Sequence, residues 1–277
     1  LHVYLFSLAG LLYILSISWP SFMGMWVCME AANLIILAGF FTSAVFVNRY
    51  SGLLGLILVS GVSSGLLFTG FMSDSYSWFF LISLFLKLGM FPFVSWVLVT
   101  LVNSPWGVFY MISSVSKISL IYFSGYLSSL DSSAIYLSFL LSFLLLSNIL
   151  LCGLVNLKMF LALSGVSTGS ILIIFLSSLG VGTSLLFLGV YMCYSLVFIG
   201  CLSWINVGLL NTNKVILTVF SVLGVPFSFG ILYKLLGSYY IVCFSTPIVA
   251  IWAFYSCIEF IYLAVLIFEK SSVIEVW

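Results

Sequence analysis

Long apolar runs follow one another along almost the whole chain, separated by short polar or charged turns. A helix needs roughly 20 apolar residues to cross a bilayer, and breaking the chain at charges, prolines and polar turns gives about ten such runs. They cover residues 2–19, 21–47, 51–72, 76–101, 105–127, 132–154, 158–178, 182–206, 215–240 and 244–268. The connections are short, so successive helices should pack as antiparallel neighbours. The pattern predicts an all-α polytopic membrane protein, with residues 1–277 forming a single transmembrane domain.

Two of these runs contain helix-breaking residues in mid-span. The fourth carries KLGMFPF at 87–93, and the ninth carries LGVPFSFG at 223–230. Proline removes a backbone donor, and such breaks are tolerated where the backbone lines a cavity or is buried in protein. Paired breaks at matching positions of two halves point to a transport site, although an ordinary proline kink is the alternative. Lys87 and Lys234 lie near the two breaks, which favours a functional role.

Composition supports a membrane protein throughout. Apolar residues make up 64% of the chain and charged residues 5%, whereas soluble domains contain about 25% charged residues. The net charge of +1 gives no reason to expect a nucleic-acid partner, and membrane lipids are the expected surroundings.

The few charges between the runs sort by side. The bases are Arg49, Lys158, Lys214 and Lys270, and the acids on the opposite side are Asp74 and Asp131. Because loops rich in Lys and Arg stay on the cytoplasmic or matrix side, both termini are expected there.

The cysteines show no metal or cluster spacing. None forms a CxxC motif, and no Walker or dinucleotide-binding loop is present. The thiols are therefore expected to be buried, free and hydrophobic in character, with no metal site or redox centre in this chain. The six residues are Cys28, Cys152, Cys193, Cys201, Cys243 and Cys257.

Two lysines lie near the middle of predicted spans. Lys87 and Lys117 lie roughly 16–18 Å along the helix from the starts of their runs, about half of a membrane core. A charge at this depth costs about 2.5–3.5 kcal/mol on insertion scales and typically belongs to an ion or proton path.

Three further ionisable residues fall inside predicted spans. They are Glu30 in the second span, Lys234 in the ninth and Glu259 in the tenth. Burial disfavours a charged lysine and a nearby carboxylate favours it, so moving or neutralising Glu30 would switch Lys87 between holding and releasing a proton. Static ion pairs that fix helix register are the alternative, and the role of Glu259 stays open.

Four blocks in order carry a family resemblance. MWVCMEAANLI, LKLGMFPFVSWV, VSKISLIY and LGVPFSFGILYK contain Glu30, Lys87, Lys117 and Lys234, respectively. Together they resemble the mitochondrial NADH dehydrogenase subunit 2 family, the antiporter-like subunits of respiratory complex I. The family has Trp-Val-x-x-Glu-x-x-Asn, Lys-Leu-Gly-x-x-Pro-Phe-His-Phe-Trp, a second lysine about 30 residues later, and Gly-x-Pro-Pro-x-x-Gly-Phe-x-x-Lys. The resemblance covers most of the chain.

This chain departs from the family at several positions. The family histidine of the central block is Val94 here, and one proline of the fourth block is Phe227. LKMFLALSGVSTGS resembles another family segment but has Thr168 where histidine usually stands. A proton relay through those histidines must therefore differ here.

The resemblance implies an antiporter-like bundle with two broken helices in the mitochondrial inner membrane. It implies proton translocation through Glu30, Lys87, Lys117 and Lys234, coupled to electron transfer from NADH to ubiquinone. FMN, iron–sulfur clusters and ubiquinone would belong to partner subunits, and other complex I membrane subunits would be the partners. A free-standing cation/proton antiporter and a structural subunit that has lost pumping are the alternatives.

Overall fold

The computed structural model describes residues 2–41, 49–72, 77–152, 156–207 and 229–275. All regular elements within these ranges are helices, most of them α-helical. The elements are α1 (His2–Ser18), α2 (Phe22–Gly39), α3 (Arg49–Met72), α4 (Ser77–Leu88), α5 (Val94–Val102), α6 (Trp106–Ser113), the 3₁₀ helix η2 (Val115–Phe123), α7 (Ser124–Leu127), α8 (Ser132–Leu151), α9 (Leu157–Ser178), α10 (Val181–Val207), α12 (Phe229–Ile241) and α13 (Thr246–Glu275).

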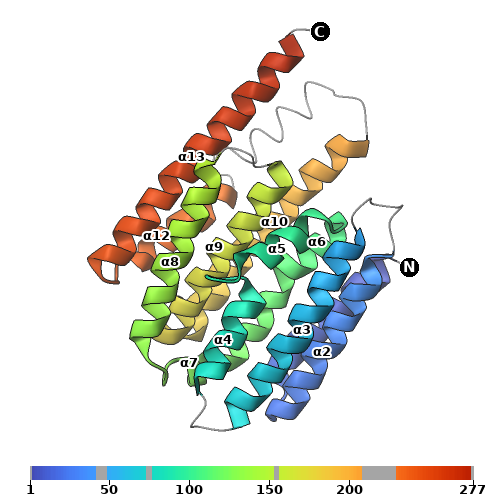
Figure 1. The fold of residues 1–277 in the computed structure, drawn as a ribbon, viewed down its shortest axis with the longest axis vertical. Helices are drawn as coiled ribbons and strands as arrows, with labels where there is room; N and C mark the ends of the chain where they lie inside the picture. Colours follow the sequence, from blue (N-terminus) through green and yellow to red (C-terminus); the bar gives the residue numbers. More distant parts are fainter. Residues whose placement is uncertain (1, 42–48, 73–76, 153–155, 208–228, 276–277) are drawn as a thin grey trace.

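The helices lie side by side in one elongated bundle (Figure 1). Helices α1 to α3 form one flank, and α8, α12 and α13 form the other. Helix α9 runs between them and packs against α5, α8 and α10. Every residue of α9 from Phe160 to Leu176 is buried, so its polar side chains lie in the interior of the protein.

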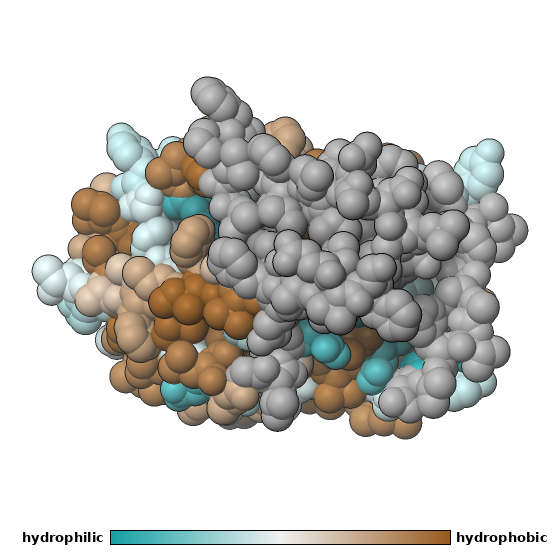
Figure 2. Space-filling view, turned by 90° about the horizontal axis from the view of Figure 1, so that it is seen from above, coloured by the Kyte–Doolittle hydropathy of each residue, from teal (hydrophilic) through white to brown (hydrophobic). Residues whose placement is uncertain are grey.

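Seven of the described segments are long and apolar enough to cross a membrane. They are Phe22–Gly39, Arg49–Met72, Trp106–Leu127, Ser132–Leu151, Leu157–Ser178, Val181–Ser203 and Thr246–Val265, and Tyr4–Ser18 and Ser77–Leu88 are shorter apolar helices. Large apolar side chains such as Leu54, Leu58 and Leu137 point outward, and apolar surface is prominent in Figure 2. An all-α polytopic membrane fold is therefore confirmed.

The break predicted in the fourth span is present. Helix α4 ends at Leu88 and α5 begins at Val94, with Gly89 at a φ of 68°. A left-handed φ favours glycine because it has no Cβ. The indole Nε1 of Trp96 donates to the carbonyl of Leu86 at 2.8 Å, so α5 satisfies an acceptor at the end of α4. Of the second predicted break, residues 223–228 lie outside the described residues.

The run at 105–127 differs from the continuous helix that its hydrophobicity predicts. Its helix is α-helical to Ser113, then 3₁₀ from Val115 to Phe123, and α-helical again in α7. The change begins at a polar run, where the Ser114 hydroxyl lies 2.9 Å from the Ser195 hydroxyl of α10. A 3₁₀ stretch of nine residues is long for this helix type and turns its side chains differently from an α-helix.

The described basic turn residues gather at one end of the bundle. Arg49 begins α3, and two residues on, the Ser51 hydroxyl accepts a bond from Asn103 Nδ2 at 3.1 Å. Lys158 at the start of α9 donates to the carbonyl of Ser104, the next residue after Asn103. The sorting predicted for Arg49 and Lys158 is therefore present.

Asp131 lies at the opposite end of the bundle. It precedes α8 by one residue and follows α7, where Tyr126 donates to the Gly70 carbonyl near the far end of α3 at 3.3 Å. Asp74 and Lys214 lie outside the described residues, as does the side chain of Lys270.

The expectation that the cysteines are buried is wrong for most of them. All six are free, and only Cys201 is buried, with Cys28 half-buried. The remaining four lie on outward faces of apolar helices or their ends, because these helices are apolar on every side and hydrophobicity does not reveal which face is inside.

Candidate functional site

Lys87 lies in the last turn of α4, directly before the break. Its ammonium group donates to the sulfur of Met29 on α2, the residue next to Glu30. The break therefore ends α4 at the position where a lysine reaches across to α2.

Glu30 belongs to a short polar network between α1 and α2. Tyr13 donates to Asn33 Oδ1 at 2.6 Å, and Asn33 Nδ2 lies 3.5 Å from Glu30 Oε1. Glu30 and Lys87 are close enough to interact electrostatically. No direct salt bridge joins these two described side chains, since Lys87 reaches Met29 instead. The carboxylate can therefore bias the lysine's charge without holding it in a fixed ion pair.

Two adjoining cavities connect Lys87 with Lys117. The first has a volume of about 30 Å³ and is lined by Lys87, Trp96 and Ser116 together with Tyr13 and Asn33. The second has a volume of about 20 Å³ and shares Lys87, Trp96 and Ser116, but it also reaches Lys117 and Gly165. The two central lysines thus line one space in the bundle.

Lys117 is the more deeply buried of the two lysines. It lies in the 3₁₀ helix, is 4% exposed, and donates to Thr168 Oγ1 at 2.7 Å and to the Gly165 carbonyl. Its ammonium also lies 4.8 Å from the centre of the Tyr191 ring. These contacts are all with neutral groups, so Lys117 is solvated by oxygens and an aromatic face and is not paired with a carboxylate.

The sequence reasoning missed the role of α9 in holding Lys117. Thr168, which stands where the family has histidine, is a direct hydrogen-bond partner of this lysine. Gly169 lies directly beside the lysine stem, since a Cβ built there would be in ordinary contact with Lys117 Cε at 3.7 Å. The signal was the run SGVSTGS at 164–170, whose small and hydroxyl residues the sequence favours as helix-packing positions.

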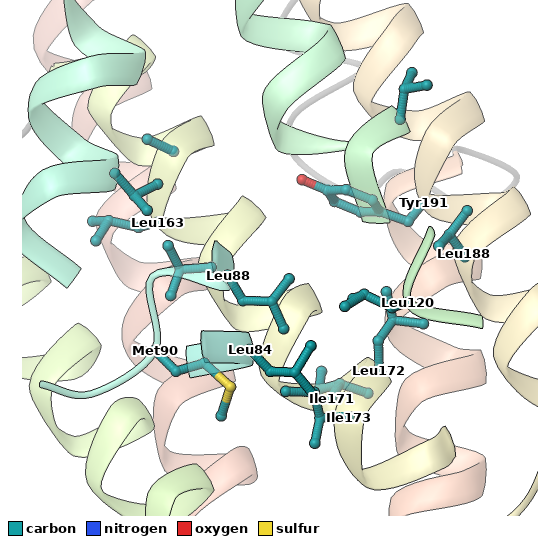
Figure 3. Close-up of a cluster of buried hydrophobic side chains, with 14 of the residues drawn as sticks. Leu84, Leu88, Met90, Leu120, Leu163, Ile171, Leu172, Ile173, Leu188 and Tyr191 are labelled. Carbon is teal, nitrogen blue, oxygen red and sulfur yellow. The ribbon is translucent and has the colours of Figure 1, made fainter. Parts of the chain in front are cut away.

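Apolar side chains close the interior around these polar groups. Leu84 and Leu88 of α4 gather with Leu120 of η2 and with Leu172 of α9, beside Tyr191 (Figure 3). Val94, at the other position where the family has histidine, is 2% exposed and is part of the same apolar core. Because these neighbours are apolar, charges inside the bundle interact more strongly than they would in water.

Lys234 lies in a separate part of the interior, between α12 and α13. Its ammonium forms an ion pair with Glu259 Oε2 at 3.0 Å, and Tyr233 donates to Glu259 Oε1 at 3.4 Å. The structure therefore gives Glu259 a partner that the sequence could not assign. Four ionisable residues were predicted to form one path. Lys87 and Lys117 line the adjoining cavities, and Glu30 adjoins the first cavity through Asn33, which lines it. Lys234 lies apart from them, paired with Glu259.

Comparison with known proteins identifies a related fold. No protein-family model matches the sequence, and no curated protein matches it. A chain in a solved structure described as respiratory complex I from Thermus thermophilus with bound aureothin is similar, with a TM-score of 0.74 and 17% sequence identity. The match covers 92% of this chain and 67% of that chain. At this identity the likeness is one of fold.

Proposed function

We propose that this chain is a proton-translocating membrane-arm subunit of NADH:ubiquinone oxidoreductase, respiratory complex I. The fold similarity to a chain of respiratory complex I supports this, as does the order of the four sequence blocks. The observation that carries the proposal is that Lys87 and Lys117 line adjoining cavities deep in an apolar bundle. Ionisable groups at such depth are costly and mark ion or proton paths.

The geometry supports a stepwise transfer. A proton held on Lys87 is stabilised by the nearby Glu30 carboxylate, so a change at Glu30 lowers the hold of Lys87 on its proton. The proton then crosses the shared cavity to Lys117. The resulting ammonium donates hydrogen bonds to Thr168 Oγ1 and the Gly165 carbonyl. Release follows through Lys234 on α12. Each step returns the donor lysine to its neutral amine.

The proposal places the chain in the mitochondrial inner membrane with both termini on the matrix side. Other complex I membrane subunits and lipids would surround it, and FMN, the iron–sulfur clusters and ubiquinone would be bound by partner subunits. The chain's own side chains would hold and move protons, and redox energy would reach them as a change at Glu30 or along the bundle.

Co-migration with enzyme activity tests membership of the complex. After mild detergent extraction and native gel separation, we expect this chain in a very large band that oxidises NADH with a quinone acceptor. Migration as a small species without that activity would contradict the proposal and favour a free-standing cation/proton antiporter, for which cation-dependent proton flux would be the assay.

Proton transfer through Lys87 is tested by substitution. We expect a Lys87→Ala complex to assemble but to move fewer protons per NADH oxidised, because the first lysine of the shared cavity is gone. The measurement is the proton-to-electron ratio in sealed vesicles. If the variant kept the proton-to-electron ratio of the unchanged complex, this chain would be a structural subunit that has lost the pumping role.

A further inference from the structure

Glu259 is a buried carboxylate that the transfer through the three lysines does not use. Its side chain is 3% exposed, whereas that of its partner Lys234 is 28% exposed. The pair therefore has an inner member, the acid on α13, and an outer member, the base on α12. A carboxylate at this depth is costly unless paired and hydrogen-bonded, and Glu259 has both kinds of partner.

Four tyrosines surround this carboxylate. Tyr191, Tyr194, Tyr233 and Tyr255 come from α10, α12 and α13, and each is at most 5% exposed. All four interact electrostatically with Glu259. Their phenol groups thus place several hydroxyls around one buried acid in an otherwise apolar interior.

The tyrosines reach from Glu259 to Lys117. The Tyr191 ring lies under the Lys117 ammonium at 4.8 Å, and the rings of Tyr191 and Tyr233 are 5.9 Å apart. Tyr233 in turn donates to Glu259. The Tyr191 hydroxyl lies beside Gly165, since a Cβ built there would be 3.6 Å from it. The separation between Lys117 and Glu259 is therefore filled by phenol groups.

Two of these hydroxyls are buried without a hydrogen-bond partner in the part of the chain that the structure describes. They are the hydroxyls of Tyr191 and Tyr255. Neither makes a hydrogen bond of good geometry, although Thr168 and Ser164 are polar neighbours of the Tyr191 hydroxyl and Ser167 is one of the Tyr255 hydroxyl. Tyr255 lines a small cavity, with a volume of about 10 Å³, together with Ser167, Tyr233, Lys234 and Glu259. A buried hydroxyl without a partner carries a cost that a bound water removes. The cavity next to Glu259 is about the size of one water, and the polar groups that would bind this water line it.

We infer that Glu259 is a proton-carrying residue of this chain and that Tyr191 and Tyr233 connect it to Lys117. The inference rests on the proposed function and extends it. The Lys117 ammonium gives up one proton and becomes an amine, and the Glu259 carboxylate takes one proton and becomes a carboxylic acid. Each tyrosine hydroxyl or bound water between them accepts one proton as it passes another on, so it is unchanged after the transfer.

Protonation of Glu259 then controls Lys234. With the carboxylate neutral, the ion pair between them is lost, and no negative charge offsets the positive charge that the Lys234 proton carries. Lys234 releases that proton through its more exposed ammonium, and the proton on Glu259 passes to the resulting amine. This restores the carboxylate and the ion pair, with one proton moved in total. The tyrosines and Glu259 thus connect the two lysines across the interior of the bundle.

The experiment compares variants in the intact, assembled complex. Glu259→Gln keeps the shape of the side chain but cannot take up a proton at this site. Its amide oxygen can still accept from Lys234, and its amide N–H can donate to the Tyr233 oxygen in place of accepting from it. We expect it to assemble in normal amount on native gels while NADH-driven proton translocation falls at least about tenfold, because a positioned proton acceptor contributes about 10²–10⁴-fold to its step. Glu259→Asp, which keeps a carboxylate, should recover part of the rate.

Tyrosine variants keep the test decisive even where Glu259→Gln fails to assemble. Tyr191→Phe and Tyr233→Phe each remove one oxygen and are expected to slow proton translocation severalfold without loss of assembly. Tyr239→Phe is the matched control, since Tyr239 on α12 is 72% exposed and touches none of these groups. It should pump as the unchanged complex does.

A double variant separates the proton-carrying role from a static ion pair. If the pair only holds α12 against α13, Lys234→Gln with Glu259→Gln should restore both assembly and pumping, which would overturn the inference. Full pumping by Glu259→Gln or by both tyrosine variants, with Lys87→Ala still defective, would also overturn it and leave the proposed function standing. Full pumping by Lys87→Ala as well would defeat both.

Discussion

Replacing Lys117 by methionine is expected to stop proton transfer through this subunit while leaving the complex assembled. Methionine has a similar length and fills the same space, and it removes a charge that is 4% exposed. Replacing a buried charge by an apolar group of similar volume is often neutral for stability. The two acceptors left behind, Thr168 Oγ1 and the Gly165 carbonyl, keep their mutual hydrogen bond at 2.9 Å. The fold loses two hydrogen bonds donated by a charged group, about 1.5–3 kcal/mol each. This loss is offset because the cost of burying the charge is also removed.

The loss in function should be much larger. Lys117 is the only lysine of the described chain that lies between the shared cavity and Tyr191. Without it, the proton has no basic group on which to rest between Lys87 and the tyrosines, and we expect at least about a tenfold fall in proton translocation. The measurement is proton uptake by sealed vesicles during NADH oxidation, beside quantification of the assembled complex.

Lys117→Arg distinguishes a moving proton from a fixed positive charge. Arginine keeps the charge but does not release its proton in proteins. If the site needs only a cation over Tyr191, the arginine variant should pump; if it needs a proton that leaves, the variant should fail as methionine does. Ile118→Met, on the same 3₁₀ helix, is the control for a new methionine and should leave pumping unchanged.

Gly70→Ala is expected to prevent normal assembly, with a larger structural effect than an added methyl group at any other glycine of α3. A Cβ at Gly70 would lie 2.3 Å from the backbone nitrogen of Phe80, so α3 and α4 must move apart. Backbone atoms cannot turn aside as side chains do, and overpacking of this kind costs about 1–3 kcal/mol or more. Small residues are what let membrane helices approach so closely.

The displacement would reach the site because α4 carries Lys87 at its other end. We expect the Gly70→Ala chain to appear in the large native band in severalfold lower amount and the remaining complex to denature at lower temperature. Gly65→Ala on the same helix is the control, because a Cβ there meets no atom within 4 Å. Equal assembly of the two variants would show that the close approach of α3 and α4 does not limit stability.

Several features could be predicted from local sequence because their causes are local. Apolar runs of bilayer length predict helices, and Gly89 with Pro92 predicts the end of α4, since both act on their own backbone. The depth of Lys87 and Lys117 follows from counting residues along their runs. Arg49 and Lys158 can likewise be assigned to one end of the bundle by counting the predicted membrane spans that precede each residue.

The partners of the charged residues could not be predicted in this way. Glu30 and Lys87 have the residue types for a salt bridge, yet the lysine donates to Met29, one position away on the same helix. Choosing between neighbouring positions depends on how α2 rotates against α4. The change of helix type before Lys117 likewise depends on Ser195 of α10, 81 residues further along the chain.

A bundle of membrane helices, a break beside Lys87 and basic residues in mid-span all follow from the order of residues along the chain. The contact of Lys117 with α9, the pairing of Lys234 with Glu259, and the contact between Tyr191 of α10 and Tyr233 of α12 follow only from how the helices pack. The physical reason is that these helices are apolar on nearly every side. The spacing of apolar and polar residues along each helix therefore does not show which face is inside. The contacts are set instead by close packing between segments far apart in the chain.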